Sequence, residues 1–145
     1  MISAKIKIDS SKLEGLIKKF SGKSPIGKLG ILDDAPARTN VTGEQIDNAT
    51  LGYVHEFGDQ GQEERSWLRA SLMGHFPKEI AIPSDVTPKG IVTELCKSGY
   101  DAIQGAFDSE GYGAWPPSYA ATSEGRLTLV DTEQLRESVS YKVEE

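Results

Sequence analysis

The last third of the chain constrains the fold most, because a short helical segment there runs directly into an alternating one. Asp131 and Thr132 are typical helix-capping residues, so a helix is expected over residues 132–137. A strand is predicted to follow at once, because apolar side chains then alternate with polar ones at Val139, Tyr141 and Val143. A strand at this end of the chain requires a partner strand elsewhere.

Two earlier segments are candidates for that partner. Residues 29–32 form a short apolar run, and an alternating half-exposed strand is predicted near the N-terminus from Ile2, Ala4, Ile6 and Ile8. Strands at both ends of the chain are expected to meet in one antiparallel sheet. No βαβ series with short loops repeats, so the expected class is α+β: a small sheet of N- and C-terminal strands packed with three or four helices in one domain, residues 1–145.

The first two helices are predicted from apolar spacing. Residues 11–20 are expected to form an amphipathic helix whose apolar stripe is Leu13, Leu16, Ile17 and Phe20. Residues 42–45 match a capping box, and Gly58 suits the left-handed position that ends a helix. The helix between these signals is expected to carry one apolar stripe of Ile46, Ala49, Tyr53, Val54 and Phe57.

Two further helices are expected in the middle of the chain. Ser66 is predicted to cap a segment that Pro77 ends, and Pro88 is predicted to start a long helix reaching about Ser109. The apolar face of the long helix is expected to be Ile91, Leu95, Ala102, Ile103, Ala106 and Phe107. Exposed loops are expected at residues 33–41, 59–64 and 111–125.

Composition excludes several classes of protein. The chain has 22 acidic and 16 basic residues, a net charge of −6, which disfavours specific nucleic-acid binding. Lysines are concentrated in the first thirty residues, so a contact of this end with an anionic partner remains an alternative to a solvated lysine face. No run of 18 apolar residues is present, so no membrane span is expected. The single cysteine, Cys96, excludes an internal disulfide and indicates folding in the cytosol.

The search for catalytic chemistry yields one alternative. His55 and Glu56 begin like the helix of a zinc protease, but Asp59 stands where the second histidine belongs, beyond the helix-ending glycine. A small metal-dependent hydrolase would have to use His55, Glu56, Asp59 and His75. Cys96 lies on the apolar side of its helix, and nucleophile-elbow and phosphate-loop patterns are missing. The expectation is a protein that is not an enzyme and holds neither metal nor cofactor.

The segment around Trp115 allows two interpretations. Trp115 lies between a small residue and two prolines in a loop rich in glycine. Its ring can pack on the core and hold the loop in place, or it can be an anchor for another protein, since tryptophan is favoured at the centres of interfaces.

Four short motifs, taken in order, resemble bacteriophage tail-completion proteins, also called virion-morphogenesis, minor tail or neck proteins. They are LGYVHEFG at residues 51–58, ERSWLR at 64–69, GAWPP at 113–117 and LVDTEQLRES at 129–138. The chain departs from the family pattern at Glu64, Trp67 and Glu133, which replace proline, phenylalanine and glycine. The stretch 120–126 also lacks the lysines that commonly follow the tryptophan loop.

The resemblance implies a structural virion protein at the neck or upper tail of a tailed phage, made in the bacterial host cytoplasm. Its expected partners are other copies of itself in a ring, with six-fold symmetry, and neck, head-closure, tail-tube or tail-terminator proteins. DNA would pass through such a ring without specific binding. The residues expected to shape the core and the contact loops are Tyr53, His55, Phe57, Trp67, Arg69, Trp115 and Arg136.

Overall fold

The protein is a small α+β fold built around one two-stranded antiparallel sheet, as the sequence predicts. The computed structural model describes residues 10–32, 38–39, 45–58, 63–84, 86–116 and 129–145. The helices within these ranges are α1 (Ser10–Phe20), α2 (Asn48–Phe57), α3 (Arg69–Gly74), α4 (Pro88–Asp108) and α6 (Leu129–Ser138). The strands are β1 (Ile26–Ile31), β2 (Arg38–Thr39), β3 (Gln45–Ile46) and β4 (Val139–Glu144).

The C-terminal strand pairs with β1. The antiparallel register runs from Ile26 opposite Glu144 to Ile31 opposite Val139. The strand predicted at residues 29–32 is therefore confirmed, but it begins earlier, at Ile26, and ends at Ile31. The strand predicted over residues 2–8 lies outside the described residues.

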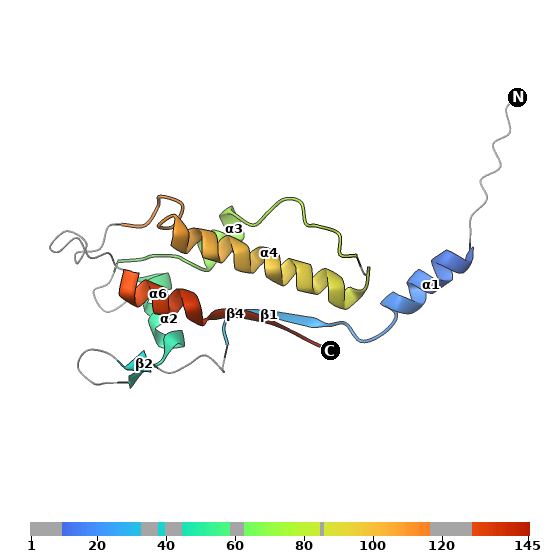
Figure 1. Cartoon of the computed structure of the whole chain (residues 1–145), viewed down its shortest axis with the longest axis horizontal. Coiled ribbons are helices and arrows are strands. Elements are labelled where there is room, and N and C mark those ends of the chain that lie inside the picture. The colour runs from blue at the N-terminus through green and yellow to red at the C-terminus, as the bar shows by residue number, and fades with distance from the viewer. Residues whose placement is uncertain (1–9, 33–37, 40–44, 59–62, 85, 117–128) are drawn as a thin grey trace, which may run out of the picture.

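Helix α4 lies along one face of this sheet (Figure 1) and approaches it closely. A Cβ atom on Gly27 would overlap Cys96 Sγ, and one on Gly99 would lie 2.6 Å from Leu29 Cδ2. Glycine at these two positions lets the helix and strand backbones approach further than larger residues allow. None of the described helices is long and apolar enough to cross a membrane.

The predicted start of α4 is confirmed, and its predicted apolar face is partly wrong. Pro88 occupies the first turn, and the Thr87 hydroxyl accepts a hydrogen bond from the Gly90 amide at 3.1 Å. Ile91 and Leu95 are exposed. The buried residues are Cys96, Gly99, Ala102, Ile103, Ala106 and Phe107. Close packing on the sheet explains the small side chains at Cys96 and Gly99, which face Gly27 and Leu29 of the strand.

The capping box predicted at residues 42–45 is wrong. Gln45 belongs to strand β3, which pairs with β2, and helix α2 begins three residues later. Asp47 is the N-cap, and its carboxylate accepts from the Thr50 amide at 2.6 Å. Gly58 ends the helix as predicted, with φ 66° and ψ 56°, and its amide donates to the Val54 carbonyl at 2.9 Å.

The expected stripe of α2 is also wrong, because the aromatic residues point outward. Tyr53 is 57% exposed and Phe57 is 49% exposed. The buried residues of the helix are Asn48, Gly52, His55 and Glu56. The carboxylate of Glu56 is buried on this face because Ser66, Leu68 and Arg69 donate hydrogen bonds to it.

The core lies where α4, α6 and β4 meet the segment before α3. Its buried apolar residues are Trp67, Ile103, Phe107, Leu135 and Val139. Helix α3 begins at Arg69 and ends at Gly74, three residues before Pro77. Helix α6 begins at Leu129, so Asp131 and Thr132 lie inside it and the capping position predicted for them is wrong. The strand predicted to follow α6 directly is confirmed as β4.

Candidate functional site

The carboxylate of Glu56 ties helix α2 to the start of α3. It accepts hydrogen bonds from the backbone amides of Leu68 at 2.8 Å and Arg69 at 3.0 Å. The Ser66 hydroxyl donates at 2.9 Å and the Arg69 guanidinium at 2.8 Å. We call Glu56, Ser66, Leu68 and Arg69 the Glu56 junction. The carboxylate caps the first turn of α3 from a different helix, where a negative charge also suits the helix dipole.

The environment of Glu56 holds it in the charged form. Burial alone raises the pKa of this carboxyl group, because a charge is less stable away from water. The two backbone amides, the Arg69 guanidinium and the Ser66 hydroxyl all stabilise the charged form, so the pKa lies below its ordinary value. Glu56 is therefore a poor proton acceptor, and its oxygens are already engaged by four donor groups.

Trp67 anchors the same junction in the core. Its indole nitrogen donates to the Gly52 carbonyl at 2.9 Å, and its ring centroid lies 6.1 Å from that of Phe107. A Cβ atom on Gly52 would lie 2.7 Å from Ile31 Cδ1 and 3.1 Å from the Trp67 ring. Helix α2 thus contacts the strand and the tryptophan through a position where no side chain fits.

Trp115 holds its loop against the body of the protein. Its ring packs edge-on against Phe107 with centroids 5.5 Å apart, and its indole nitrogen donates to the Ser66 carbonyl at 3.4 Å. Buried Arg65 donates to the Pro116 carbonyl at 3.3 Å. Gly111 adopts a φ of 69°, and a Cβ atom there would overlap the Trp115 ring. These contacts favour the packing interpretation of Trp115 over the anchor for another protein.

Arg136 connects α6 to α4. Its guanidinium pairs with Asp108 at 2.6 Å and donates to the Gln104 side-chain oxygen at 2.7 Å. The Gln104 amide donates back to the Arg136 carbonyl at 3.4 Å. Arg136 therefore joins α6 to α4 through both its side chain and its backbone carbonyl.

The outward side of α2 carries an aromatic surface. The rings of Tyr53 and Phe57 lie 4.8 Å apart, and the Arg69 guanidinium lies 4.5 Å from the Phe57 ring centre. Arg69 also pairs with exposed Glu64 at 3.0 Å. We call Tyr53, Phe57 and Arg69 the aromatic patch. Arg69 belongs both to this surface and to the Glu56 junction, so the two are connected.

Among the described residues of the hydrolase alternative, the structure does not gather His55, Glu56 and His75 into a metal site. His55 is buried on α2, and its carbonyl accepts from the Arg65 amide at 2.7 Å. His75 stacks on Tyr112, with ring centroids 3.6 Å apart. Asp59 lies outside the described residues. Within the described ranges, no three His, Cys, Asp or Glu side chains are gathered in a way that would hold a metal ion.

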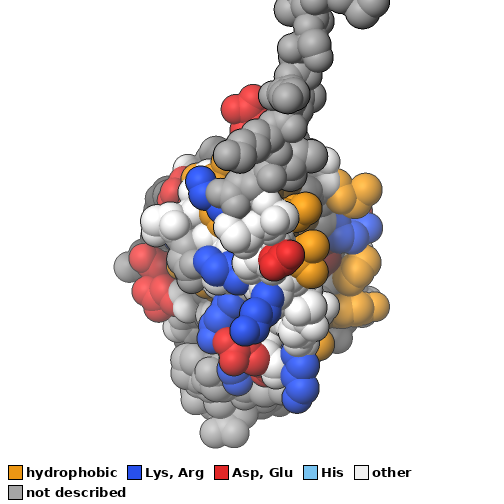
Figure 2. Space-filling model, turned by 90° about the vertical axis from the view of Figure 1, so that its right-hand side faces the viewer, with side chains coloured by type: hydrophobic (Ala, Val, Ile, Leu, Met, Phe, Trp, Pro, Cys, Tyr) orange, Lys and Arg blue, Asp and Glu red, His pale blue; other side chains and the backbone are white. Residues whose placement is uncertain are grey.

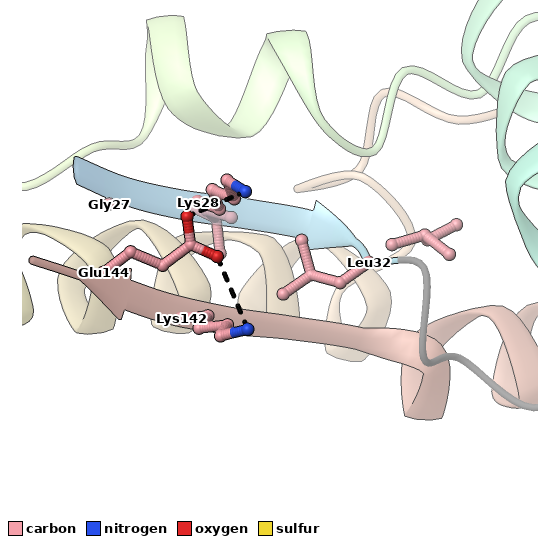
Figure 3. A pocket seen from close by; sticks show the side chains of 7 residues that line it. Gly27, Lys28, Leu32, Lys142 and Glu144 are labelled. Atoms are coloured by element: carbon pink, nitrogen blue, oxygen red, sulfur yellow. Dashed lines mark ion pairs between the residues drawn. The ribbon is translucent and has the colours of Figure 1, made fainter.

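One hollow of about 600 Å³ lies along strand β1 (Figure 3). Its charged side chains satisfy one another, because Glu144 pairs with Lys28 at 2.9 Å and with Lys142 at 3.4 Å. The remaining lining residues are Gly27, Leu29, Ile31 and Leu32.

The seven residues expected at the site divide into two groups. Trp67, Trp115, His55 and Arg136 hold elements together, whereas Tyr53, Phe57 and part of Arg69 face solvent. Sequence reasoning gave Glu56 a role only as a hydrolase residue and missed Gly52. The signal was present in the spacing, since Asn48, Gly52, His55 and Glu56 recur on one helical face.

Comparisons with known proteins return no relative. No protein-family model matches the chain, and no curated protein or solved structure matches it significantly.

Proposed function

We propose that the protein is a structural virion component of a tailed bacteriophage that completes the tail or joins it to the head, assembling as a ring without catalysis. The observation that carries the proposal is the way the four resembling motifs fit together. The motifs at residues 51–58 and 64–69 form the Glu56 junction, and Trp115 of the third motif donates to Ser66 of the second. The fourth motif supplies Leu135, a member of the same core.

This fit supports the view that the four motifs were inherited together as one structural unit, and not that each resembles the phage family by chance. Residues that are separated in the sequence but joined by specific hydrogen bonds constrain one another, whereas chance matches need not meet in space. The proposal gives the junction a stabilising role and the exposed aromatic patch a contact role. Tyrosine, tryptophan and arginine are the residues that most often dominate binding at protein interfaces.

The sheet offers a second kind of contact. Within the described residues, β1 and β4 pair only with each other, so each strand has one edge without a strand partner. An unpaired edge presents backbone donors and acceptors that a neighbouring subunit can use. A ring of identical subunits repeats such a head-to-tail contact until it closes. The expected partners are further copies of this chain and the neck, head-closure and tail proteins above and below the ring.

Deleting the gene from its parent phage tests the proposal. Electron microscopy of the lysate is expected to show filled heads beside unattached tails, or tails of irregular length. Expression of the wild-type protein from a plasmid should restore infectious particles. The Phe57→Ser variant should restore few particles, and the matched Met73→Ser variant, altered at an exposed residue of α3, should restore as many as the wild type. Intact and infectious particles without the gene would overturn the proposal.

A further inference from the structure

Helix α1 exposes an apolar stripe that the rest of the chain does not cover. None of its residues is buried, and its four large apolar side chains are about half exposed: Leu13 52%, Leu16 46%, Ile17 59% and Phe20 48%. The helix projects from the end of β1 that is farther from α2 (Figure 1). An amphipathic helix gains most of its stability by packing this stripe, so α1 requires a partner surface.

The charge of α1 narrows the choice of partner. Residues 10–25 contain four lysines and one glutamate, and the view onto this end of the molecule shows Lys and Arg side chains beside hydrophobic ones (Figure 2). Residues 26–145 contain 20 acidic and 10 basic residues. A basic amphipathic helix attached to an acidic body fits the body of another copy of the same chain.

The aromatic patch on α2 has the complementary character. Residues 39–64, which include α2, contain six acidic residues and neither lysine nor arginine. Asp47, Glu63 and Glu64 among them are exposed. Tyr53 and Phe57 provide an apolar centre within this acidic segment, and the charge of Arg69 is matched by Glu56 and Glu64. An apolar centre with acidic surroundings suits an apolar stripe flanked by lysines.

The linker makes a contact within one chain unfavourable. From Phe20 to Ile26 the backbone spans at most about 20 Å. Strand β1 itself is about 17 Å long, and α2 contacts its far end at Ile31. The linker would have to extend fully and run back along β1 merely to reach the inner side of α2. The C-terminal half of α1, with Leu16 to Phe20, therefore does not reach the patch of its own chain.

We propose that α1 of one copy docks on the aromatic patch of a second copy, with its apolar stripe on Tyr53 and Phe57 and its lysines beside the acids around them. Each copy donates one helix and accepts another, which links the copies head to tail. The inference rests on the self-association part of the proposed function. The two can fail separately, because cross-linking tests the helix contact and phage microscopy tests the role in the virion.

Cross-linking between single-cysteine variants tests the docking directly. In a Cys96→Ala background, one copy carries Ile17→Cys, and a second copy with a size tag carries Tyr53→Cys. After mild oxidation, the mixed 17–53 dimer is expected in at least about tenfold excess over a control pair, because docking raises the local concentration of the two thiols. The control pairs Ile17→Cys with Met73→Cys, since Met73 is 87% exposed on α3.

A charge variant checks the electrostatic part of the docking. Lys12→Glu/Lys18→Glu is expected to reduce the 17–53 yield several-fold, and Lys78→Glu elsewhere on the body to leave it unchanged. The wild-type yield should fall as salt rises, because exposed charges are screened.

Three results would overturn the docking. One is an equal yield for the 17–53 and 17–73 pairs. Another is predominant cross-linking within single chains that carry both Ile17→Cys and Tyr53→Cys. The third is binding of α1 to phosphatidylserine vesicles in the absence of any 17–53 dimer, which would assign the stripe to a lipid surface.

Discussion

The two faces of helix α2 differ in a way that reverses the usual arrangement. The inner face buries Asn48, Gly52, His55 and Glu56, whereas the outer face exposes the rings of Tyr53 and Phe57. A helix that packs on a core normally buries its aromatic side chains and exposes its carboxylates. Here the inner face meets donor groups and a tryptophan that fills the space over a glycine, so polar and small residues are the ones that fit.

Within helix α2, the residues that stabilise the fold therefore differ from those that are free to contact another molecule. Glu56 and Gly52 are placed by specific partners, and any change there disturbs the protein itself. Tyr53 and Phe57 are about half exposed, and the ring contacts seen for them are with each other and with Arg69, so we expect the fold to depend on them less. Exposed aromatic residues that do not serve the fold are candidates for contacts with another molecule. Five predictions test this separation, in order of decreasing effect on stability.

Replacing Trp67 with alanine should have the largest effect. The ring is 4% exposed and donates to the Gly52 carbonyl, so the variant loses both core packing and a buried hydrogen bond. The free energy of unfolding is expected to fall by about 3–5 kcal/mol, measured by urea denaturation. A loss no larger than that of Tyr53→Ala would remove the distinction between the two faces.

Glu56→Gln should have the second largest effect, lowering the free energy of unfolding by about 3 kcal/mol. The amide retains the shape of the carboxylate but turns one acceptor into a donor, which then faces either the Leu68 amide at the Oε2 position or the Arg69 amide at the Oε1 position. Glu64→Gln is the matched control, because Glu64 pairs with the same arginine at the surface. The control variant is expected to lose less than about 1 kcal/mol, and equal losses would contradict the capping role of Glu56.

Gly52→Ala is expected to destabilise the protein by about 1–3 kcal/mol through overpacking. The added methyl group would meet Ile31, Trp67 and Leu135, all within 3.3 Å. Gly74→Ala provides the comparison, because it adds the same group at the end of a helix with nothing within 4 Å. That change should be neutral or slightly stabilising, as alanine favours helix over glycine.

The junction should also make stability depend on pH. The pKa of Glu56 is lower in the folded protein than its ordinary value of 4.5. Its contribution is therefore present above about pH 4.5 and is lost as the pH falls further towards the folded pKa. Denaturation curves from pH 6 to pH 3 should show a steeper loss for the wild type than for Glu56→Gln. Parallel curves would mean that other carboxylates account for the acid sensitivity.

Tyr53→Ser and Phe57→Ser should change stability least. Because both side chains are about half exposed, the loss is expected to stay within about 1 kcal/mol in urea denaturation. Self-association, measured by sedimentation at several protein concentrations, is expected to weaken in both variants. A large loss of stability with unchanged association would contradict the contact role of these rings. It would show that the outer face of α2 stabilises the fold as the inner face does.

The sequence by itself determined the elements whose signals are local. The helix from Pro88, the end of α2 at Gly58 and the strand after Ser138 follow from a proline suited to a first turn, a left-handed glycine and an alternating pattern. The α+β class followed from them. Trp67 and Arg69 were recognised at the sequence level through the resemblance of their motif.

Only the tertiary structure decided which faces are buried. Apolar spacing placed Tyr53 and Phe57 on one stripe and Ile91 and Leu95 on another, yet all four are substantially exposed. Spacing reports only how apolar a face is, whereas burial depends on the shape and hydrogen-bonding groups of whatever packs against it. Gly52 and Gly99 are buried because a strand and a tryptophan approach them closely. Glu56 is buried because four donors from a distant segment meet its carboxylate.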